Sequence, residues 1–222
     1  MKMVKYQRQI RALISTHLSV LENDNSFALG GLTEEEEDGV RALVESCGLF
    51  SNEASFHTKT RRHEEKELCG LSPSEETSCI VEFGTLFGIT TGLLAHYKSA
   101  KMKVITVDNF CWNPFGLTPE MHKAFTRRIL RCQLAKGDVE LVEMDSKTFR
   151  DTYKGRIPNM VFLDADHSYE AVRDEIAWAK KIGVPLISGH DYGNSRFGVT
   201  KAVDEAFPDG VQVKGMVWSH KG

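Results

Sequence analysis

The chain has 222 residues, a length that suits one α/β domain with an appended segment, or at most two small domains. Its 28 lysines and arginines and 31 aspartates and glutamates leave a net charge of −3, which gives no reason to expect nucleic acid as a partner. No apolar run approaches the roughly 18 residues of a membrane span, and basic residues interrupt the first 20 positions, so neither a membrane nor a signal peptide is expected. Five cysteines without metal-type spacing predict reduced thiols in a cytoplasmic protein.

Residues 1–75 differ from the rest and are predicted to form a helical cap or lid, because helical patterns dominate them. Apolar residues recur at helical spacing over 10–21, which predicts an amphipathic helix. Thr33 and Glu36 have the spacing of a capping box at the start of a second helix. The charged stretch 58–68 lacks an apolar face, so a solvated helix or loop is a better interpretation than a lid over a site.

Residues 76–222 alternate between strand and helix patterns and are predicted to form one catalytic domain. Five short apolar strands are expected, over 79–83, 103–107, 139–143, 159–163 and 184–188. Helical stretches are expected near 88–98, 118–135, 169–181 and 198–207. Continuously apolar strands that alternate with helices predict a mostly parallel sheet covered on both faces, a Rossmann-like, doubly wound α/β fold.

Carboxylates stand at the ends of four of these strands: Glu82, Asp108, Asp164 and Asp191. The carboxyl ends of parallel strands share one rim, and ligands of such sheets bind there. Turn chemistry alone does not readily explain four acids at one rim, so the pattern predicts a ligand site.

The segment VEFGTLFGITTG after the first strand gives the first clue to the ligand. Its Gly84 and Gly88 lack the G-x-G-x-x-G spacing that closes backbone amides on a pyrophosphate. Glu82 adds negative charge, which suits a ligand with an ammonium and a sulfonium group better. Asp108 ends the second strand, where a carboxylate can accept both hydroxyls of a ribose, and the pair Asp145–Ser146 is placed to meet an adenine edge.

Several motifs carry a family resemblance. VEFGTLFGITT, VITVDNF and VEMDSKTF resemble the successive cofactor motifs of class I S-adenosylmethionine-dependent methyltransferases, and E-x-G-T-x-x-G is similar to small-molecule O-methyltransferases. FLDADHSYEAV and ISGHDYGNSRFGVTKAVDEAF resemble macrocin-type sugar and natural-product O-methyltransferases. The resemblance covers about residues 76–210 and implies S-adenosyl-L-methionine as cofactor. It implies methionine-moiety contacts at Glu82, Gly84, Thr85 and Gly88, ribose at Asp108, adenine at Asp145 and Ser146, and a further cofactor contact at Asp164.

The resemblance also implies a metal site. In metal-dependent members a carboxylate ends the fourth strand, and a carboxylate with a neighbouring oxygen ligand ends the fifth. Asp164 and Asp191 match these positions, and His167 stands where the macrocin-like pattern has a base. A cation held by carboxylates lowers the pKa of an acceptor hydroxyl and orients it, and a histidine can then take the proton.

One position departs from the sugar enzymes' pattern and another from that of catechol-type enzymes. His190 replaces an acid of the sugar enzymes, and Tyr192 replaces an asparagine of catechol-type enzymes. Either Asp166 or water completes a Mg²⁺ shell, or a softer ion such as Mn²⁺, Fe²⁺ or Zn²⁺ uses His190. A metal-free site with His167 and His190 as bases also stays open. Asp166 fits the N-cap of the following helix better than a ligand role.

These patterns favour a metal-assisted O-methyltransferase that acts on a hydroxyl of a small molecule, such as a sugar or natural product. The first 75 residues and the loop after Asp108 are expected to set the acceptor. A non-catalytic adenosyl-ligand-binding relative is one alternative, and a nucleotide-dependent oxidoreductase, disfavoured by the glycine spacing, is another. The expected partner is a small-molecule hydroxyl acceptor, and a homodimer stays open.

Overall fold

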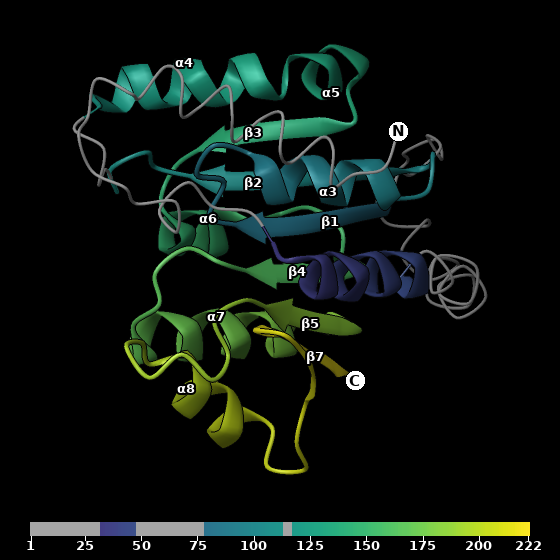
Figure 1. Cartoon of the computed structure of the whole chain (residues 1–222), viewed down its shortest axis with the longest axis vertical. Helices are drawn as coiled ribbons and strands as arrows, with labels where there is room; N and C mark the ends of the chain where they lie inside the picture. The colour runs from purple at the N-terminus through teal and green to yellow at the C-terminus, as the bar shows by residue number, and fades with distance from the viewer. Residues whose placement is uncertain (1–31, 48–77, 113–116) are drawn as a thin grey trace, which may run out of the picture.

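A computed structural model of the protein describes residues 32–47, 78–112 and 117–222. Its centre is one sheet of seven strands in the order β3-β2-β1-β4-β5-β7-β6 (Figure 1). The strands are β1 (Ser78–Phe83), β2 (Met102–Asp108), β3 (Val139–Glu143), β4 (Met160–Leu163), β5 (Leu186–Gly189), β6 (Gln212–Lys214) and β7 (Val217–Lys221). The first five are mutually parallel, and β7 is antiparallel to both β5 and β6. The expected mostly parallel sheet is confirmed, with each predicted strand within two residues of its observed bounds.

Six labelled helices surround this sheet, together with a helix over residues 34–47. They are α3 (Ile89–Tyr97), α4 (Pro119–Ile129), α5 (Arg131–Lys136), α6 (Ser146–Thr152), α7 (Tyr169–Ile182) and α8 (Val199–Ala206). The single helix expected over 118–135 is two helices, α4 and α5, which meet at the buried Leu130. None of the described helices combines the length and apolar character that a membrane crossing requires.

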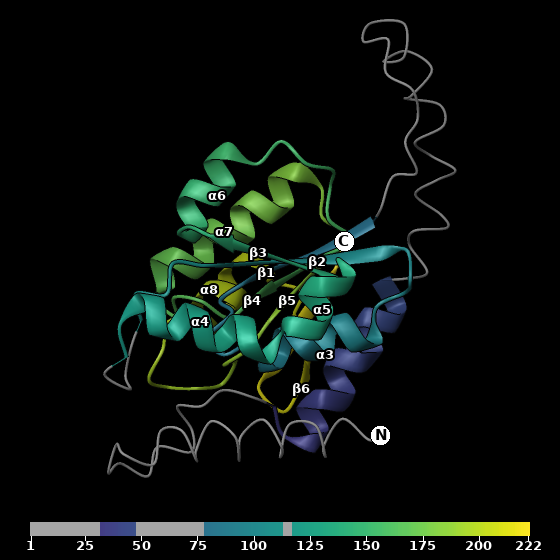
Figure 2. The ribbon, with the colours of Figure 1, turned by 90° about the horizontal axis from the view of Figure 1, so that it is seen from above.

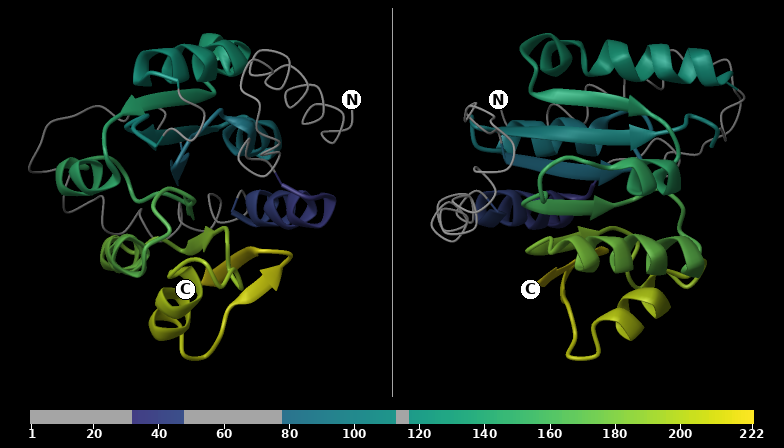
Figure 3. Two further views of the ribbon diagram at one scale, coloured as in Figure 1. Left: turned by 60° about the vertical axis from the view of Figure 1, so that its left-hand side comes forward. Right: turned by 180° about the vertical axis from the view of Figure 1, so that it is seen from behind.

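The sheet separates two hydrophobic cores, which makes the fold doubly wound (Figure 2). On one face α3 and the helix over 34–47 pack against the strands through Leu93, Leu94, Val40 and Val44. On the other face α6, α7 and α8 bury Phe149, Val172, Ile176, Val199 and Val203. Seen from behind, α6 and α7 lie in front of the strands (Figure 3). The apolar spacing that predicted α7 and α8 is therefore the spacing of their buried faces.

The β6–β7 hairpin and the short helix α6 were not expected. All three residues of β6 are exposed, so it has no apolar pattern to read. In α6 the one buried residue is Phe149, and its N-cap is Asp145. A seven-residue helix with one buried side chain gives too little periodicity to recognise.

The helix over 34–47 is the part of the N-terminal segment that the structure describes. The expected capping box is confirmed, because Thr33 N donates to Glu36 Oε2 (2.8 Å) and Glu36 N donates to Thr33 Oγ1 (3.3 Å). This helix packs on a face of the sheet through Val40 and Val44, and Glu36 in its first turn contacts His190 at the rim. The rest of the predicted cap, including 10–21 and 58–68, lies outside the described residues. The division at residue 75 stays a prediction.

Candidate active site

The loop after β1 is shaped by two glycines in left-handed conformation. Gly84 has φ 91°, and a Cβ there would lie 2.1 Å from the backbone oxygen of Asp164. Gly88 has φ 79°, and a Cβ there would lie 2.8 Å from the Leu130 side chain. Between them Leu86 adopts φ 45°, a conformation that side-chain-bearing residues seldom adopt. The glycines therefore let the predicted cofactor loop touch the end of β4, where the second group of predicted residues begins.

Asp108, at the end of β2, holds this loop in place. Its Oδ2 accepts hydrogen bonds from the backbone N–H groups of Thr85 and Leu86, both at 2.9 Å, and its Oδ1 accepts from Phe110 N at 2.7 Å. A carboxylate offers about four lone-pair sites, so a ribose hydroxyl can still bind. The ribose contact stays a prediction. The structure also shows that Asp108 holds the loop after β1 in place, a role that the sequence did not indicate.

Glu82 is fully buried beneath the loop and does not open onto the rim. Its Oε2 accepts hydrogen bonds from the hydroxyls of Thr91 (2.5 Å) and Thr106 (2.6 Å), whereas its Oε1 has no hydrogen-bond partner among the described residues. Burial raises the Glu82 pKa to about 8, although the two hydroxyls oppose the shift. The contact of Glu82 with a methionine ammonium stays a prediction.

Asp145 and Ser146 lie at the start of α6. Asp145 is the N-cap: its oxygens accept from Thr148 N (2.8 Å) and Thr148 Oγ1 (2.6 Å), and these hydrogen bonds lower its pKa. Ser146 is the first helical residue. The structure thus assigns Asp145 a helix-capping role, and the adenine contact stays a prediction.

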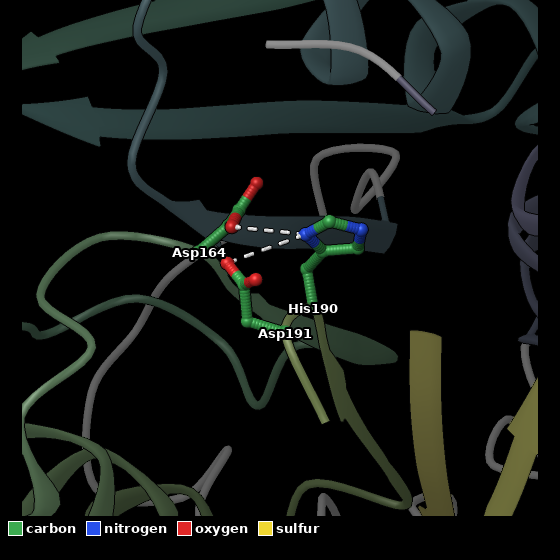
Figure 4. A group of neighbouring side chains, drawn as sticks. All are labelled: Asp164, His190 and Asp191. Atoms are coloured by element: carbon green, nitrogen blue, oxygen red, sulfur yellow. Dashed lines mark ion pairs between the residues drawn. The ribbon is translucent and has the colours of Figure 1, made fainter. Parts of the chain in front are cut away.

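At the ends of β4 and β5, Asp164, His190 and Asp191 form a cluster that could hold a metal ion (Figure 4). Each contributes one potential ligand atom, and the three atoms lie within 4.8 Å of one another. His190 Nδ1 is 3.8 Å from Asp164 Oδ1 and 3.5 Å from Asp191 Oδ2. Asp191 adopts φ 61° and accepts a hydrogen bond from the Asn194 side chain (2.8 Å). Carboxylate oxygens and an imidazole nitrogen at this separation fit a divalent cation.

His167 joins the cluster from the loop between β4 and α7. Its Nε2 lies 3.3 Å from Asp164 Oδ1 and 3.5 Å from Asp191 Oδ2, and its ring packs against Phe197 with centroids 4.5 Å apart. Burial lowers its pKa, but the hydrogen bond and charge of Asp164, together with the charge of Asp191, raise it more. The structure therefore brings together the predicted base and all three predicted ligands.

Asp166 is not part of the cluster, and it is not the N-cap of α7 either. The cap is Ser168, whose side chain accepts from Ala171 N, and Asp166 accepts from Ser168 N at 2.8 Å. The N-cap prediction was two residues early, because an aspartate and a serine compete for the same role.

Glu36 is a site residue that sequence reasoning missed. Its Oε1 lies 3.4 Å from His190 Nε2 on the side of the ring away from Asp164 and Asp191. Burial opposes ionisation of Glu36, but the close contact with His190 and the hydrogen bonds from Thr33 and Met216 lower its pKa to about 2. The pKa of His190 is raised to about 10: burial opposes this shift, and the contacts with Asp191 and Glu36 outweigh burial. The capping-box pattern indicated only a helix start, and nothing in it pointed to a residue so distant in sequence.

An open hollow lies beside the cluster, with a volume of about 510 Å³. Residues of the loop after β5, including Asn194 and Phe197, and of α8 border it. Asn194 bonds Asp191 and Phe197 packs on His167, so two of the residues that border the hollow also contact the cluster.

The sheet order, the single antiparallel β7 and the acidic rim define the Rossmann-like fold of class I methyltransferases. The structure is similar to an O-methyltransferase from Bacillus cereus in complex with S-adenosylhomocysteine, with TM-score 0.59, 16% identity, and coverage of 100% of this chain and 91% of that one. It is also similar to cofactor-bound Rv0187 from MTB, with TM-score 0.56, 17% identity and coverage of 90% and 76%. A protein from Corynebacterium glutamicum gives TM-score 0.57, 10% identity and coverage of 94% of both chains. No protein-family model matches the sequence, and no curated protein matches it. At such identities the likeness establishes the fold.

Proposed function

We propose that the protein is an S-adenosylmethionine-dependent O-methyltransferase that methylates a hydroxyl of a small molecule with the help of a divalent cation. The observation that carries the proposal is the convergence of Asp164, His167, His190 and Asp191 at the ends of β4 and β5. This cluster adjoins the glycine loop after β1, because Gly84 packs against the backbone of Asp164.

The cofactor would bind over the carboxyl ends of β1, β2 and β3. The fold supports this placement, and the similar Bacillus cereus protein was crystallised with S-adenosylhomocysteine. Within this chain, Asp108 retains acceptor capacity for a ribose, and Glu82 Oε1 is a buried acceptor without a partner among the described residues. The contact between Gly84 and Asp164 would bring the methyl donor next to the acceptor site.

The reaction is an in-line displacement: the acceptor oxygen forms a bond to the methyl carbon as the carbon–sulfur bond breaks. A divalent cation at Asp164, His190 and Asp191 would lower the pKa of the acceptor hydroxyl and orient it. His167 would receive the hydroxyl proton on its imidazole. Asp164 and Asp191 raise the His167 pKa, and neutralising their charge would return this imidazole towards the neutral, proton-accepting form.

The acceptor would occupy the hollow bordered by the loop after β5 and α8. Phe197 offers an apolar surface there, 40% exposed and in contact with His167. The volume of about 510 Å³ is within the usual range for pockets that hold small molecules.

The test combines binding and turnover. Calorimetry should show that S-adenosylmethionine and S-adenosylhomocysteine bind and that NAD does not. Methyl transfer from labelled S-adenosylmethionine to a panel of sugars, catechols and polyketide alcohols should stop on chelation and resume with added divalent ions. Binding of NAD alone would overturn the proposal, and methyl transfer that survives chelation unchanged would remove the cation from it.

A further inference from the structure

The His190 ring has an acidic partner at each of its two nitrogens. Nδ1 faces Asp164 and Asp191, as the dashed lines in Figure 4 show, at 3.8 and 3.5 Å. Nε2 is buried and lies 3.4 Å from Glu36 Oε1. The ring therefore spans from the cluster at the rim to a carboxylate inside the protein.

That inner carboxylate is fixed before any ligand arrives. Glu36 Oε2 accepts from the backbone N–H and the hydroxyl of Thr33, and Glu36 Oε1 accepts from Met216 N at 3.0 Å. Its side chain is 4% exposed, and a Cβ on Gly215 would lie 2.5 Å from Glu36 Cγ. The helix start and the β6–β7 turn thus hold Glu36 Oε1 at the back of His190.

We propose that Glu36 is a positioning residue that makes His190 a nitrogen ligand, through Nδ1, for a borderline divalent ion such as Zn²⁺, Fe²⁺ or Co²⁺ in preference to Mg²⁺. The inference rests on the proposed function, whose cation it identifies by class. With Glu36 Oε1 3.4 Å from Nε2, the ring would keep its Nε2–H towards Glu36 and give up the Nδ1 proton to the ion, which leaves the Nδ1 lone pair directed at Asp164 and Asp191. Histidines that bind metals usually donate their other N–H to an acceptor, and a carboxylate in that role also makes the ligand more basic.

The donor set selects the ion. Mg²⁺ and Ca²⁺ take oxygen ligands, whereas an imidazole suits Zn²⁺, Fe²⁺ and other transition ions. The imidazole nitrogen of His190 beside two carboxylates therefore favours a transition ion over Mg²⁺.

The second histidine of the cluster is less suited to this role. His167 Nε2 approaches the same two carboxylates, but the ring packs on the half-exposed Phe197 beside the hollow. His190 is the more buried of the two, with 14% of its side chain exposed against 25% for His167. We therefore assign His190 as the ligand of the ion and His167 as the base that faces the acceptor.

The first measurement uses the full-length protein stripped with a chelator. Calorimetric titrations should show Zn²⁺ and Co²⁺ binding at one site at least 100-fold more tightly than Mg²⁺. The Co²⁺ complex should show the intense visible absorption of a low-coordinate site with a nitrogen ligand. Equal or tighter binding of Mg²⁺, or a weak octahedral Co²⁺ spectrum, would overturn the inference.

Three variants then test whether Glu36 acts by positioning His190 or only by stabilising the fold. Glu36→Gln should weaken Zn²⁺ and Co²⁺ binding by about 10–100-fold, the usual cost of losing such a partner. Glu37→Gln is the matched control, because the neighbouring buried Glu37 accepts from Tyr97 at 2.8 Å and should leave metal affinity within twofold. His190→Asp should narrow the preference for Zn²⁺ over Mg²⁺ by at least tenfold, because it replaces the nitrogen ligand with a third oxygen ligand. That narrowing does not depend on Glu36→Gln folding well, and its absence would contradict the assignment of His190.

The outcome also distinguishes this inference from the proposed function. If Mg²⁺ restores methyl transfer and Glu36→Gln leaves Zn²⁺ affinity unchanged, the methyltransferase stands and the inference falls. If Zn²⁺ binds as described but S-adenosylmethionine does not bind, the metal site stands and the proposed function falls.

Discussion

The two halves of the carboxyl rim carry similar acids in very different surroundings. At the carboxyl ends of β1, β2 and β3, the carboxylates of Glu82, Asp108 and Asp145 accept hydrogen bonds from the chain's own hydroxyls and amides. After β4 and β5, Asp164 and Asp191 instead face two histidines at 3.3–3.8 Å. In the first half the acids hold a loop and cap a helix. In the second half the acids lie close to one another and to two histidines.

This difference separates acids that serve the fold from acids that are available to a ligand. Glu82, Asp108 and Asp145 are bound by hydroxyls and amides of the chain, whereas Asp164 and Asp191 are paired with imidazoles whose pKa values they raise. Three non-glycine residues of the described chain have left-handed φ: Leu86 and Phe110 in the first half, and Asp191 in the second. Substitutions in the second half should therefore affect chemistry, and those in the first half should affect stability and cofactor binding together.

The largest effect is expected in the second half. Asp191→Asn should lower turnover by about 10³–10⁴-fold, because stabilisation by a catalytic cation amounts to several kcal/mol. S-adenosylmethionine affinity, measured by calorimetry, should stay within about threefold. A loss of cofactor binding as large as the loss of turnover would contradict the separation of the two halves.

His167→Ala should lower turnover by about 10²–10⁴-fold, the usual scale for a general base. The remaining activity should rise with pH, because hydroxide replaces the imidazole as proton acceptor. Cation affinity should change little, since His190 is the proposed nitrogen ligand. If the pH profile of the variant keeps the wild-type shape, His167 is not the base.

In the first half, Glu82 should make stability depend on pH. Burial raises its pKa from 4.5 to about 8, so its contribution is fully present below pH 4.5 and is lost as the pH rises through 8. Glu175, also buried, has a pKa raised to about 7 and acts in the same direction. Between pH 5 and pH 8.5 the free energy of unfolding of the cofactor-free protein, from urea titrations, should fall less in Glu82→Gln than in the wild type, by about 2–4 kcal/mol. Parallel curves for the two proteins would show that Glu82 is not protonated in the native state.

Much of the fold could be predicted from sequence, because its strands are buried on both faces and read as continuous apolar runs. Ile80, Val104 and Val161 are all fully buried. Exposed strands lack this apolar signal: β6 is exposed along its length, so no apolar periodicity predicts it. A sheet edge of this kind is fixed by pairing with β7, which only the folded chain shows.

The site could be predicted in part for a related reason. Asp164 and Asp191 interrupt apolar strands, and topology places such strand ends at one rim. His167 and His190 are neighbours of those positions in sequence, so the family resemblance was enough to select them. Glu36 was out of reach, since its contact with His190 depends on how a helix packs across the sheet. The same holds for Asp108, whose loop-building bonds depend on the path of the loop after β1.

The smallest expected effect tests whether Asp108 has a second role. Asp108→Ala should weaken S-adenosylmethionine binding by about 1–3 kcal/mol, because polar contacts are left unmade. The variant also loses three bonds to backbone amides, at Thr85, Leu86 and Phe110, so a loss of affinity alone does not reveal a ribose contact. A thermodynamic cycle separates the two roles: the affinities of the wild type and of Asp108→Ala are each measured for S-adenosylmethionine and for an analogue that lacks the ribose hydroxyls. If Asp108 binds the ribose, the wild type should lose about 1 kcal/mol on removal of the hydroxyls and the variant should lose nothing. If both proteins lose the same binding free energy, Asp108 only holds the loop, and the acids in the first half of the rim have a structural role alone.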